Sequence, residues 1–276
     1  NRTGRKGKIS VGQGKIRIEN LNKTFVTRRQ TIQAVKDVNM SIEEGEFVSL
    51  IGPSGCGKST IIRMIDDLIK PTSGKIYVDQ VELTEYKRIP AEINKKIGFI
   101  FQLPNLLPWL TVRENVCFPL KVYKMRNAAS ERYADELIEM AGLKEYKDAY
   151  PSEISGGVTQ RIGVIRALVH KPEIVFMDEP FGALDTMMRE QLDMEILKIC
   201  RSMKKTVIFI THDVEEAVLL SDRIYVMGTN PGRIVKEVKI ELEKERTLSM
   251  LTEEKFQKYC SELTGYIGKI DLSKIV

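Results

Sequence analysis

The sequence predicts an α/β fold with a mostly parallel sheet. Short apolar runs alternate along the chain with stretches of helical periodicity, which is the pattern of buried strands connected by helices. A glycine-rich turn separates one such run from a helical stretch and has the residue pattern of a phosphate-binding loop. From residue 111 to about 156 the pattern is mostly helical, which indicates a helical insertion within the α/β core.

Five apolar runs have the length and composition of buried strands. They lie at residues 47–51, 97–101, 174–177, 207–210 and 224–227. Nearer the N-terminus, residues 15–19 and 34–42 alternate in the two-residue period of a half-exposed sheet. Strands of both kinds are therefore expected, in a buried core sheet and in a sheet near the start of the chain.

Helical periodicity is clearest in five stretches, at residues 59–68, 130–141, 158–169, 189–203 and 214–220. Pro104 and Pro108 block a helix at residues 103–110, so that segment is expected to be irregular. Phe256, Cys260 and Leu263 share one face of an expected final helix. We expect this helix to pack on the core.

Composition and charge exclude several classes of protein. Of the 276 residues, 42% are hydrophobic and 29% charged, as in ordinary soluble domains. The net charge of +5 is mild, so a solvated basic surface is expected rather than one that binds nucleic acid. No stretch approaches the ~18 apolar residues that span a bilayer, and no signal-peptide core follows the basic N-terminus. We therefore expect a cytosolic protein, or one peripheral on the cytosolic side of a membrane.

The cysteines and histidines argue against a disulfide framework and a zinc site. Cys56, Cys117, Cys200 and Cys260 are far apart in the sequence, which predicts buried free thiols in a reducing compartment. The chain has only two histidines, so a histidine-based zinc site is not expected.

Residues 52–59, Gly-Pro-Ser-Gly-Cys-Gly-Lys-Ser, match the P-loop pattern GxxxxGK[ST] between a strand and a helix. Its glycines let backbone N–H groups turn towards phosphate oxygens, and the helix N-terminus adds a positive dipole end. Lys58 can reach the β- and γ-phosphates, and the Ser59 hydroxyl can hold Mg²⁺. The candidate nucleotide-binding residues here are Gly52, Pro53, Ser54, Gly55, Cys56, Gly57, Lys58, Ser59 and Thr60. Kinases, GTPases and motors all use a P-loop, so this motif alone predicts only a nucleotide.

Two acids, Asp178 and Glu179, follow the apolar run at residues 174–177. Ligands bind at the C-terminal ends of strands in open α/β sheets. Asp178 therefore suits support of Mg²⁺, and Glu179 is placed to polarise the attacking water as a general base. Alone, two acids could simply end a strand, but together with the P-loop they favour hydrolysis of a nucleoside triphosphate.

With four further segments, these motifs resemble the ABC ATPase family. Residues 154–161, Ile-Ser-Gly-Gly-Val-Thr-Gln-Arg, are similar to the family signature LSGGQ. Gln102 stands at the Q-loop, residues 181–185 (Phe-Gly-Ala-Leu-Asp) look like the D-loop, and residues 211–213 (Thr-His-Asp) look like the switch-histidine loop. Phe25 stands where the family stacks an aromatic ring on adenine; the alternative for Phe25 is a core residue at a strand end.

This resemblance covers roughly residues 16–232 in the family's order. It implies a P-loop NTPase (RecA-like) fold: a mostly parallel sheet core with an N-terminal antiparallel β lobe and an inserted helical subdomain at about 103–170. The ABC ATPase domain would then occupy residues 16–232. A flexible lead-in at 1–15 would precede it, and a tail with a helix at 233–276 would follow.

The resemblance also implies a head-to-tail dimer, in which each ATP lies between the P-loop of one subunit and the signature of the other. Ser155, Gly156 and Gly157 precede a predicted helix, so they would offer N–H groups to the γ-phosphate. The implied cofactors are ATP and Mg²⁺. By resemblance the catalytic residues are Glu179, His212 and Gln102. The residues that would hold the metal ion are Ser59, Gln102 and Asp178, and Asp185 would belong to the nucleotide site.

Longer segments are similar to the ATPases of one importer branch, those for nitrate, sulfonate, taurine and bicarbonate. The segments are residues 101–116, 181–190 and 214–233. Such an importer needs a second ATPase subunit, transmembrane permease subunits and an extracytoplasmic binding protein, with this chain on the cytoplasmic side of a prokaryotic inner membrane. Trp109 could shape a groove for the permease or pack in the core of the helical lobe, and both alternatives stay open.

One departure from the family pattern is Val158, which stands where the signature usually has glutamine. Valine has no amide donor, so an altered rate is expected rather than lost activity. The alternatives to an importer are an ABC exporter and a soluble ABC ATPase. Only roughly a hundred residues separate Gly52 from Ser155, too few for the long coiled coil of repair ATPases. The signature and His212 disfavour a P-loop kinase or GTPase.

Overall fold

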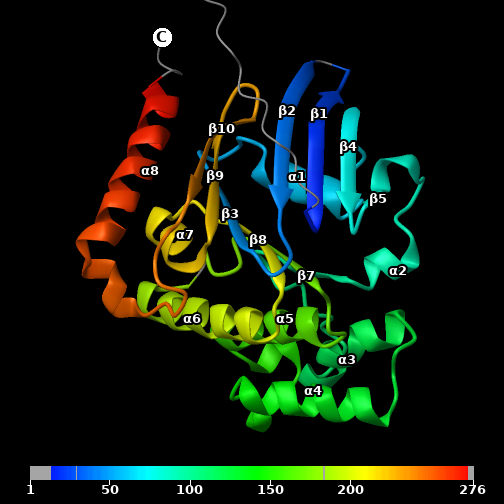
Figure 1. The fold of residues 1–276 in the computed structure, drawn as a ribbon. Helices are drawn as coiled ribbons and strands as arrows, with labels where there is room; N and C mark the ends of the chain where they lie inside the picture. The colour runs from blue at the N-terminus through cyan, green and yellow to red at the C-terminus, as the bar shows by residue number, and fades with distance from the viewer. Residues whose placement is uncertain (1–13, 29, 183, 273–276) are drawn as a thin grey trace, which may run out of the picture.

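The computed structural model describes residues 14–28, 30–182 and 184–272, with side chains to residue 270. Of the lead-in expected at residues 1–15, residues 1–13 lie outside this described part. The chain forms two sheets, a set of helices packed on them and a separate helical lobe (Figure 1). Within the described ranges, no helix is both long and apolar enough to cross a membrane.

The main sheet has six strands in the order β10-β9-β3-β8-β7-β6. They are β3 (Phe47–Ile51), β6 (Ile97–Ile100), β7 (Ile174–Asp178), β8 (Thr206–Ile210), β9 (Arg223–Gly228) and β10 (Arg233–Lys239). All pairs are parallel except β10 with β9. Every residue of β3, β7 and β8 is buried, as expected for strands covered on both faces. The five predicted core strands are confirmed, and β10 was not predicted.

A second, antiparallel sheet has the order β2-β1-β4-β5. Its strands are β1 (Ile16–Val26), β2 (Thr31–Ile42), β4 (Ser73–Val78) and β5 (Val81–Glu82). Ile16 and Ile18 of β1 are fully buried, whereas the alternate side chains are partly exposed. This confirms the N-terminal antiparallel lobe, although β4 and β5 were not predicted.

Helix α1 (Lys58–Ile65) fills the space between the two sheets. Its Ile61, Ile62 and Ile65 are fully buried in a cluster with apolar side chains of both sheets, including Ile18 of β1 and Leu50 of β3. Because the phosphate loop lies directly before α1, this packing holds the loop at the edge of the main sheet.

The opposite face of the main sheet packs against α6 (Thr186–Ser202), α7 (Val214–Leu220) and α8 (Glu254–Leu272). A 3₁₀ helix, η4 (Leu248–Thr252), precedes α8. Phe256, Cys260 and Leu263 of α8 are buried in this cluster, which confirms the predicted packing of the final helix. All four cysteines of the chain are buried, as predicted.

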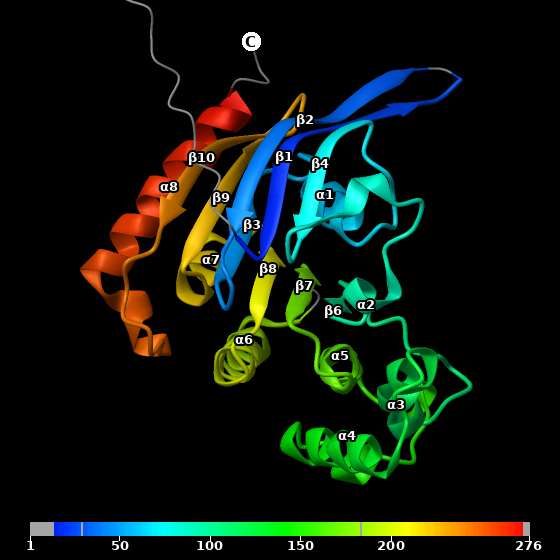
Figure 2. The same cartoon turned by 45° about the vertical axis from the view of Figure 1, so that its right-hand side comes forward.

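Figure 2 shows α3 (Val112–Val122), α4 (Ala128–Met140) and α5 (Gly156–Leu168) grouped as a lobe beside the main sheet. Val116, Leu137 and Ile162 belong to a separate apolar core of this lobe. Arg113 of α3 donates two hydrogen bonds, of 2.8 and 3.0 Å, to the Asp135 carboxylate of α4. The remaining short helices are η1 (Leu83–Glu85), α2 (Ala91–Asn94), η2 (Lys144–Tyr146) and η3 (Pro151–Glu153).

Candidate nucleotide-binding and hydrolytic site

The phosphate loop joins the end of β3 to the start of α1, as predicted. Gly57 is the N-cap of α1 and has φ 101°, a backbone conformation that glycine adopts without the steric cost that other residues would incur. Gly52 has φ 151°, and a Cβ there would lie 2.5 Å from the carbonyl oxygen of Met227 on β9. These two glycines are therefore required by the backbone of the loop. The first N–H groups of α1 are the donors that an anion at this helix end would use.

Lys58 is buried within this loop, with 6% of its surface exposed. Its Nζ donates to the carbonyl oxygens of Gly52 at 2.7 Å and of Pro53 at 3.3 Å. A buried ammonium needs such partners, and anionic phosphate oxygens would be stronger ones. The lysine places the positive charge of the loop where the sequence predicted it.

Ser59 and Asp178 meet at the edge of the main sheet. The Ser59 hydroxyl donates to Asp178 Oδ1 at 2.8 Å. Burial raises the pKa of Asp178, and the neighbouring Glu179 charge adds to this rise, while the Ser59 hydrogen bond opposes it. A hydroxyl and a carboxylate oxygen held together are hard donors of the kind Mg²⁺ prefers, and a divalent cation would stabilise the buried charge. The residues present thus fit the ion that the sequence implies.

Glu179 and His212 face each other across the ends of β7 and β8. The distance between His212 Nδ1 and Glu179 Oε2 is 3.4 Å. The Glu179 N–H donates to the carbonyl of Ile210 at 3.0 Å, which anchors its backbone to β8. Glu179 has φ 46°, in the left-handed region that a side chain with a Cβ rarely adopts. This strained position holds a carboxylate beside an exposed imidazole, which is an arrangement for orienting a water molecule.

The switch-histidine loop is fixed at its base by the start of α7. The Asp213 side chain caps this helix by accepting hydrogen bonds from the N–H groups of Glu215 and Glu216 at 2.9 and 3.2 Å. The Thr211 hydroxyl accepts from the N–H of Asp213 at 2.9 Å. His212 is therefore exposed, whereas hydrogen bonds fix the residues on either side of it.

The signature segment caps and starts α5. Ser155 is the N-cap, and Gly156 and Gly157 are the first helical residues. The expected helix start at residue 158 was therefore wrong by two residues, because glycines in a first turn lack the apolar periodicity that marks the rest of the helix. Ser155 and Gly156 are exposed, and a Cβ on Gly156 would meet no atom within 4 Å. Val158 is partly buried against the lobe core, which explains an apolar residue there.

Three predicted residues lie at the margins of this cluster. Asp185 caps α6 by accepting from the N–H of Met188 at 3.1 Å. Phe25, near the end of β1, is 38% exposed, and Lys23 Nζ lies 4.9 Å from its ring centroid, so it is not a core residue. Gln102 follows β6 and is exposed. The structure brings Lys58, Ser59, Asp178, Glu179 and His212 to one edge of the sheet, and the roles of Asp185, Phe25 and Gln102 stay predictions.

Sequence reasoning missed Gln160. This residue of α5 is 6% exposed, and its amide donates to the carbonyl oxygens of Pro180 and, at 3.4 Å, of Gln102. It thus joins the signature helix to the segments that follow β7 and β6. Buried residues occupy most positions of α5 from 160 to 168, so no one-sided pattern in the sequence could have revealed it.

The structure distinguishes the two interpretations of Trp109, a groove for the permease or packing in the core of the helical lobe. Its side chain is 69% exposed, so it does not pack in the lobe core. Phe101, Leu103 and Phe118 are also exposed. Large apolar side chains that are exposed in one stretch of the sequence favour the interface interpretation.

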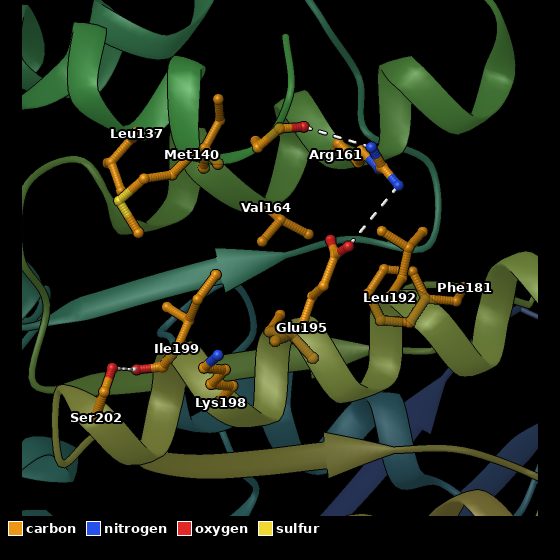
Figure 3. A pocket seen from close by; sticks show the side chains of 13 residues that line it. Leu137, Met140, Arg161, Val164, Phe181, Leu192, Glu195, Lys198, Ile199 and Ser202 are labelled. Atoms are coloured by element: carbon orange, nitrogen blue, oxygen red, sulfur yellow. Dashed lines mark hydrogen bonds and ion pairs between the residues drawn. The ribbon is translucent and has the colours of Figure 1, made fainter. Parts of the chain in front are cut away.

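A separate pocket of about 360 Å³ lies between α4, α5 and α6, and Figure 3 shows the side chains that line it. Leu137, Val164 and Leu192 give it an apolar lining. Arg161 and Glu195 form an ion pair across it, with 3.9 Å between Nη2 and Oε1. None of the residues predicted to bind nucleotide lines this pocket, so it is a different place from the site at the sheet edge.

Comparisons with known proteins bear on the family and on the activity. The family described as ABC transporter matches residues 35–182. The chain is 40% identical to the nitrate import ATP-binding protein NrtD of Synechocystis, over 91% of this chain and 94% of that protein. It is 37% identical to an aliphatic sulfonates import ATP-binding protein SsuB of Bacillus cereus, over 94% of this chain and 99% of that protein.

Two further likenesses bear on function and fold. The choline transport ATP-binding protein OpuBA of Bacillus subtilis is 41% identical, over 79% of this chain and 56% of that protein. A solved dimeric structure of a bacterial ABC transporter cassette superposes with a TM-score of 0.74 at 38% identity, covering 83% of this chain and all of that one.

Proposed function

This chain belongs to the ABC transporter family and is an ATPase coupled to transport, and from that premise we propose that it energises the import of a small anion such as nitrate, a sulfonate, taurine or bicarbonate. The observation that carries the proposal is the match to the nitrate import protein, which spans 91% of this chain and 94% of that protein. The sulfonate import protein matches over a similar extent. Both matches cover more than nine-tenths of this chain and of the relative.

A second candidate is an importer of a cationic solute such as choline. It is favoured by the 41% identity to the choline transport protein. That match spans 56% of the relative, so the two proteins differ over much of the relative's length. The anion proposal therefore has the broader support.

We propose that two copies of this chain close head to tail around ATP. Ser155 and Gly156, at the start of α5, are exposed. This supports the proposal, because their N–H groups are accessible to ATP bound on the phosphate loop of a second copy. Transmembrane permease subunits would dock at the exposed Trp109, on the cytoplasmic side of the membrane. An extracytoplasmic binding protein would deliver the solute.

The hydrolytic steps follow from the residues at the sheet edge. Lys58 and the N–H groups of the phosphate loop would bind the β- and γ-phosphate oxygens. Ser59 and Asp178 would hold Mg²⁺, which would supply positive charge to those phosphates. Glu179 would accept a proton from the attacking water, and His212 would hold the Glu179 carboxylate and the γ-phosphate in register. Phosphate release would then remove the contacts that hold the two copies together.

The test is purification with the membrane partner. The tagged chain is expressed in its source cells, extracted in mild detergent, and the co-purifying proteins are identified. The complex is reconstituted in proteoliposomes with its binding protein, and ATP hydrolysis is measured with nitrate, taurine, a sulfonate, bicarbonate or choline outside. Stimulation by one of the anions is the expected result. Stimulation by choline alone would replace the anion proposal, and absence of any permease would overturn transport by this subunit.

A further inference from the structure

One arginine of α6 links the two loops that flank the Glu179 carboxylate. Arg189 Nη2 donates to the carbonyl oxygen of Leu184, in the D-loop, at 3.1 Å. Its Nη1 lies 3.7 Å from Asp213 Oδ2, directly after His212. A single planar guanidinium therefore holds together two loops that come from different strands of the main sheet.

The position of Arg189 in its helix is unusual. It lies in the first turn of α6, where the helix dipole disfavours a positive charge. A cation placed there needs stabilising partners, and Asp213 is one. Burial raises the pKa of the carboxyl groups of Asp193 on α6 and Glu216 on α7, and the Arg189 charge opposes that rise in both. Asp213, which caps α7, is thus the acid that holds the arginine.

The same residues surround the hydrolytic pair. Arg189, Gly182, Thr211 and Glu216 line a small hollow together with Glu179 and His212. The N–H of Gly182 donates to the carbonyl oxygen of Glu179 at 3.3 Å, so the D-loop is joined to the backbone of Glu179 as well. A shift of either loop would therefore change the distance between His212 and Glu179.

We propose that Arg189 is a positioning residue for ATP hydrolysis, which sets the switch-histidine loop against the D-loop and so fixes His212 beside Glu179. This inference rests on the proposed roles of Glu179 and His212. Arg189 lies in α6 and does not belong to the phosphate loop that would bind ATP. Its loss should therefore slow the chemical step and leave nucleotide affinity unchanged.

The experiment compares Arg189→Met and Arg189→Lys in the full chain. We expect Arg189→Met to lower kcat roughly 10- to 100-fold, with KM for ATP within about twofold of wild type, because a displacement of about 1 Å at a reacting group can cost that much. Arg189→Lys keeps the charge but has no planar fork, so it should restore only part of kcat. Arg201→Met is the matched control, since Arg201 lies near the end of the same helix and pairs with Asp222 at 3.5 Å.

A double-mutant cycle separates positioning from simple loss of stability. Asp213→Asn keeps a capping side chain but removes the charge that faces Arg189. The kcat effects of Arg189→Met and Asp213→Asn should be non-additive, with melting temperatures close to that of Arg201→Met. Additive effects, or a wild-type kcat in Arg189→Met, would overturn the inference. Glu179→Gln is measured alongside; if it retains full turnover, the proposed hydrolytic site itself is wrong.

Discussion

The hydroxyl of Ser59 donates a 2.8 Å hydrogen bond to Oδ1 of Asp178, across 119 positions of the sequence. The two residues meet because β3 and β7 both pair in parallel with β8, so their C-terminal ends share one edge of the sheet. Burial raises the pKa of Asp178, which makes its ionised form costly until a cation is near. This pair is therefore the place where magnesium dependence can be tested.

Ser59→Ala should reduce the Mg²⁺ dependence of ATP binding. Wild type is expected to bind ATP more tightly with Mg²⁺ than with EDTA, whereas the variant should lose most of that difference, because one oxygen donor is gone. Titration of ATP by calorimetry under both conditions measures this. Ser202→Ala, on the last residue of α6, is the control. An unaltered response to Mg²⁺ in Ser59→Ala would contradict the assignment.

Glu179→Gln should lower the rate of ATP hydrolysis by at least about 100-fold while ATP still binds, because the base is removed and the phosphate loop is intact. The variant should also accumulate as an ATP-bound dimer, seen by size-exclusion chromatography with light scattering. His212→Ala should give a similar loss of turnover, since it removes the 3.4 Å partner of Glu179. A variant that hydrolyses ATP at the wild-type rate would show that the base is elsewhere.

Lys58→Ala should weaken ATP binding about tenfold or more, because a charge-assisted hydrogen bond contributes about 1.5–3 kcal/mol. Equilibrium binding of a fluorescent ATP analogue measures the change. Lys95→Ala is a suitable control, since Lys95 forms a surface ion pair with Glu92. Equal affinities for the two variants would exclude Lys58 from phosphate binding.

Stability should depend on pH through Asp193, which is buried, and its partly buried neighbour Glu216. Burial raises the pKa of both carboxyls above their values in the unfolded chain. The folded state therefore holds a proton more tightly, and the stability linked to it is present at acid pH and lost as the pH rises through the folded pKa. Asp193→Asn is neutral at every pH. Its free energy of unfolding relative to wild type should rise from pH 5 to 9, by about 1.4 kcal/mol for each pH unit over which only the folded chain holds the proton.

Urea denaturation at several pH values measures this difference. Asp148→Asn is the control, because Asp148 is exposed. A difference between Asp193→Asn and wild type that stays constant with pH would show that the pair does not retain its proton.

Phe256→Ala should destabilise the chain by about 3–5 kcal/mol, as expected for truncation of a fully buried aromatic side chain. Lys258→Ala changes an exposed position of α8 two residues further on, on the other side of the helix, and should leave stability within about 0.5 kcal/mol. Chemical denaturation followed by tryptophan fluorescence or circular dichroism compares the two. Equal unfolding midpoints would mean that α8 adds nothing to the core.

The sequence predicted those parts of the fold and site that depend on local pattern. The core strands were recognisable because both faces are buried, and the phosphate loop because its backbone demands glycine at fixed spacing. Strands β4, β5 and β10 were missed, since they are short or carry exposed charged residues such as Lys75 and Lys239. Their pairing is set by neighbouring strands rather than by their own composition.

The residues of the site also divide into those that the sequence could predict and those that it could not. Asp178 and Glu179 could be placed because strand ends share an edge, which topology alone requires. Gln160, Arg189 and the pair of Asp193 with Glu216 could not be found, because a polar residue becomes informative only when its burial and partners are known. Those depend on how α5, α6 and α7 pack, which no local window of sequence encodes.

The backbone of Glu179, at φ 46°, has a consequence for how this protein can change over generations. Asparagine or glycine would adopt that conformation at lower cost, by about 1 kcal/mol. A laboratory screen that selects for heat resistance alone should therefore enrich replacements at this position and yield heat-stable proteins that do not hydrolyse ATP. Glutamate persists there only while turnover itself is under selection.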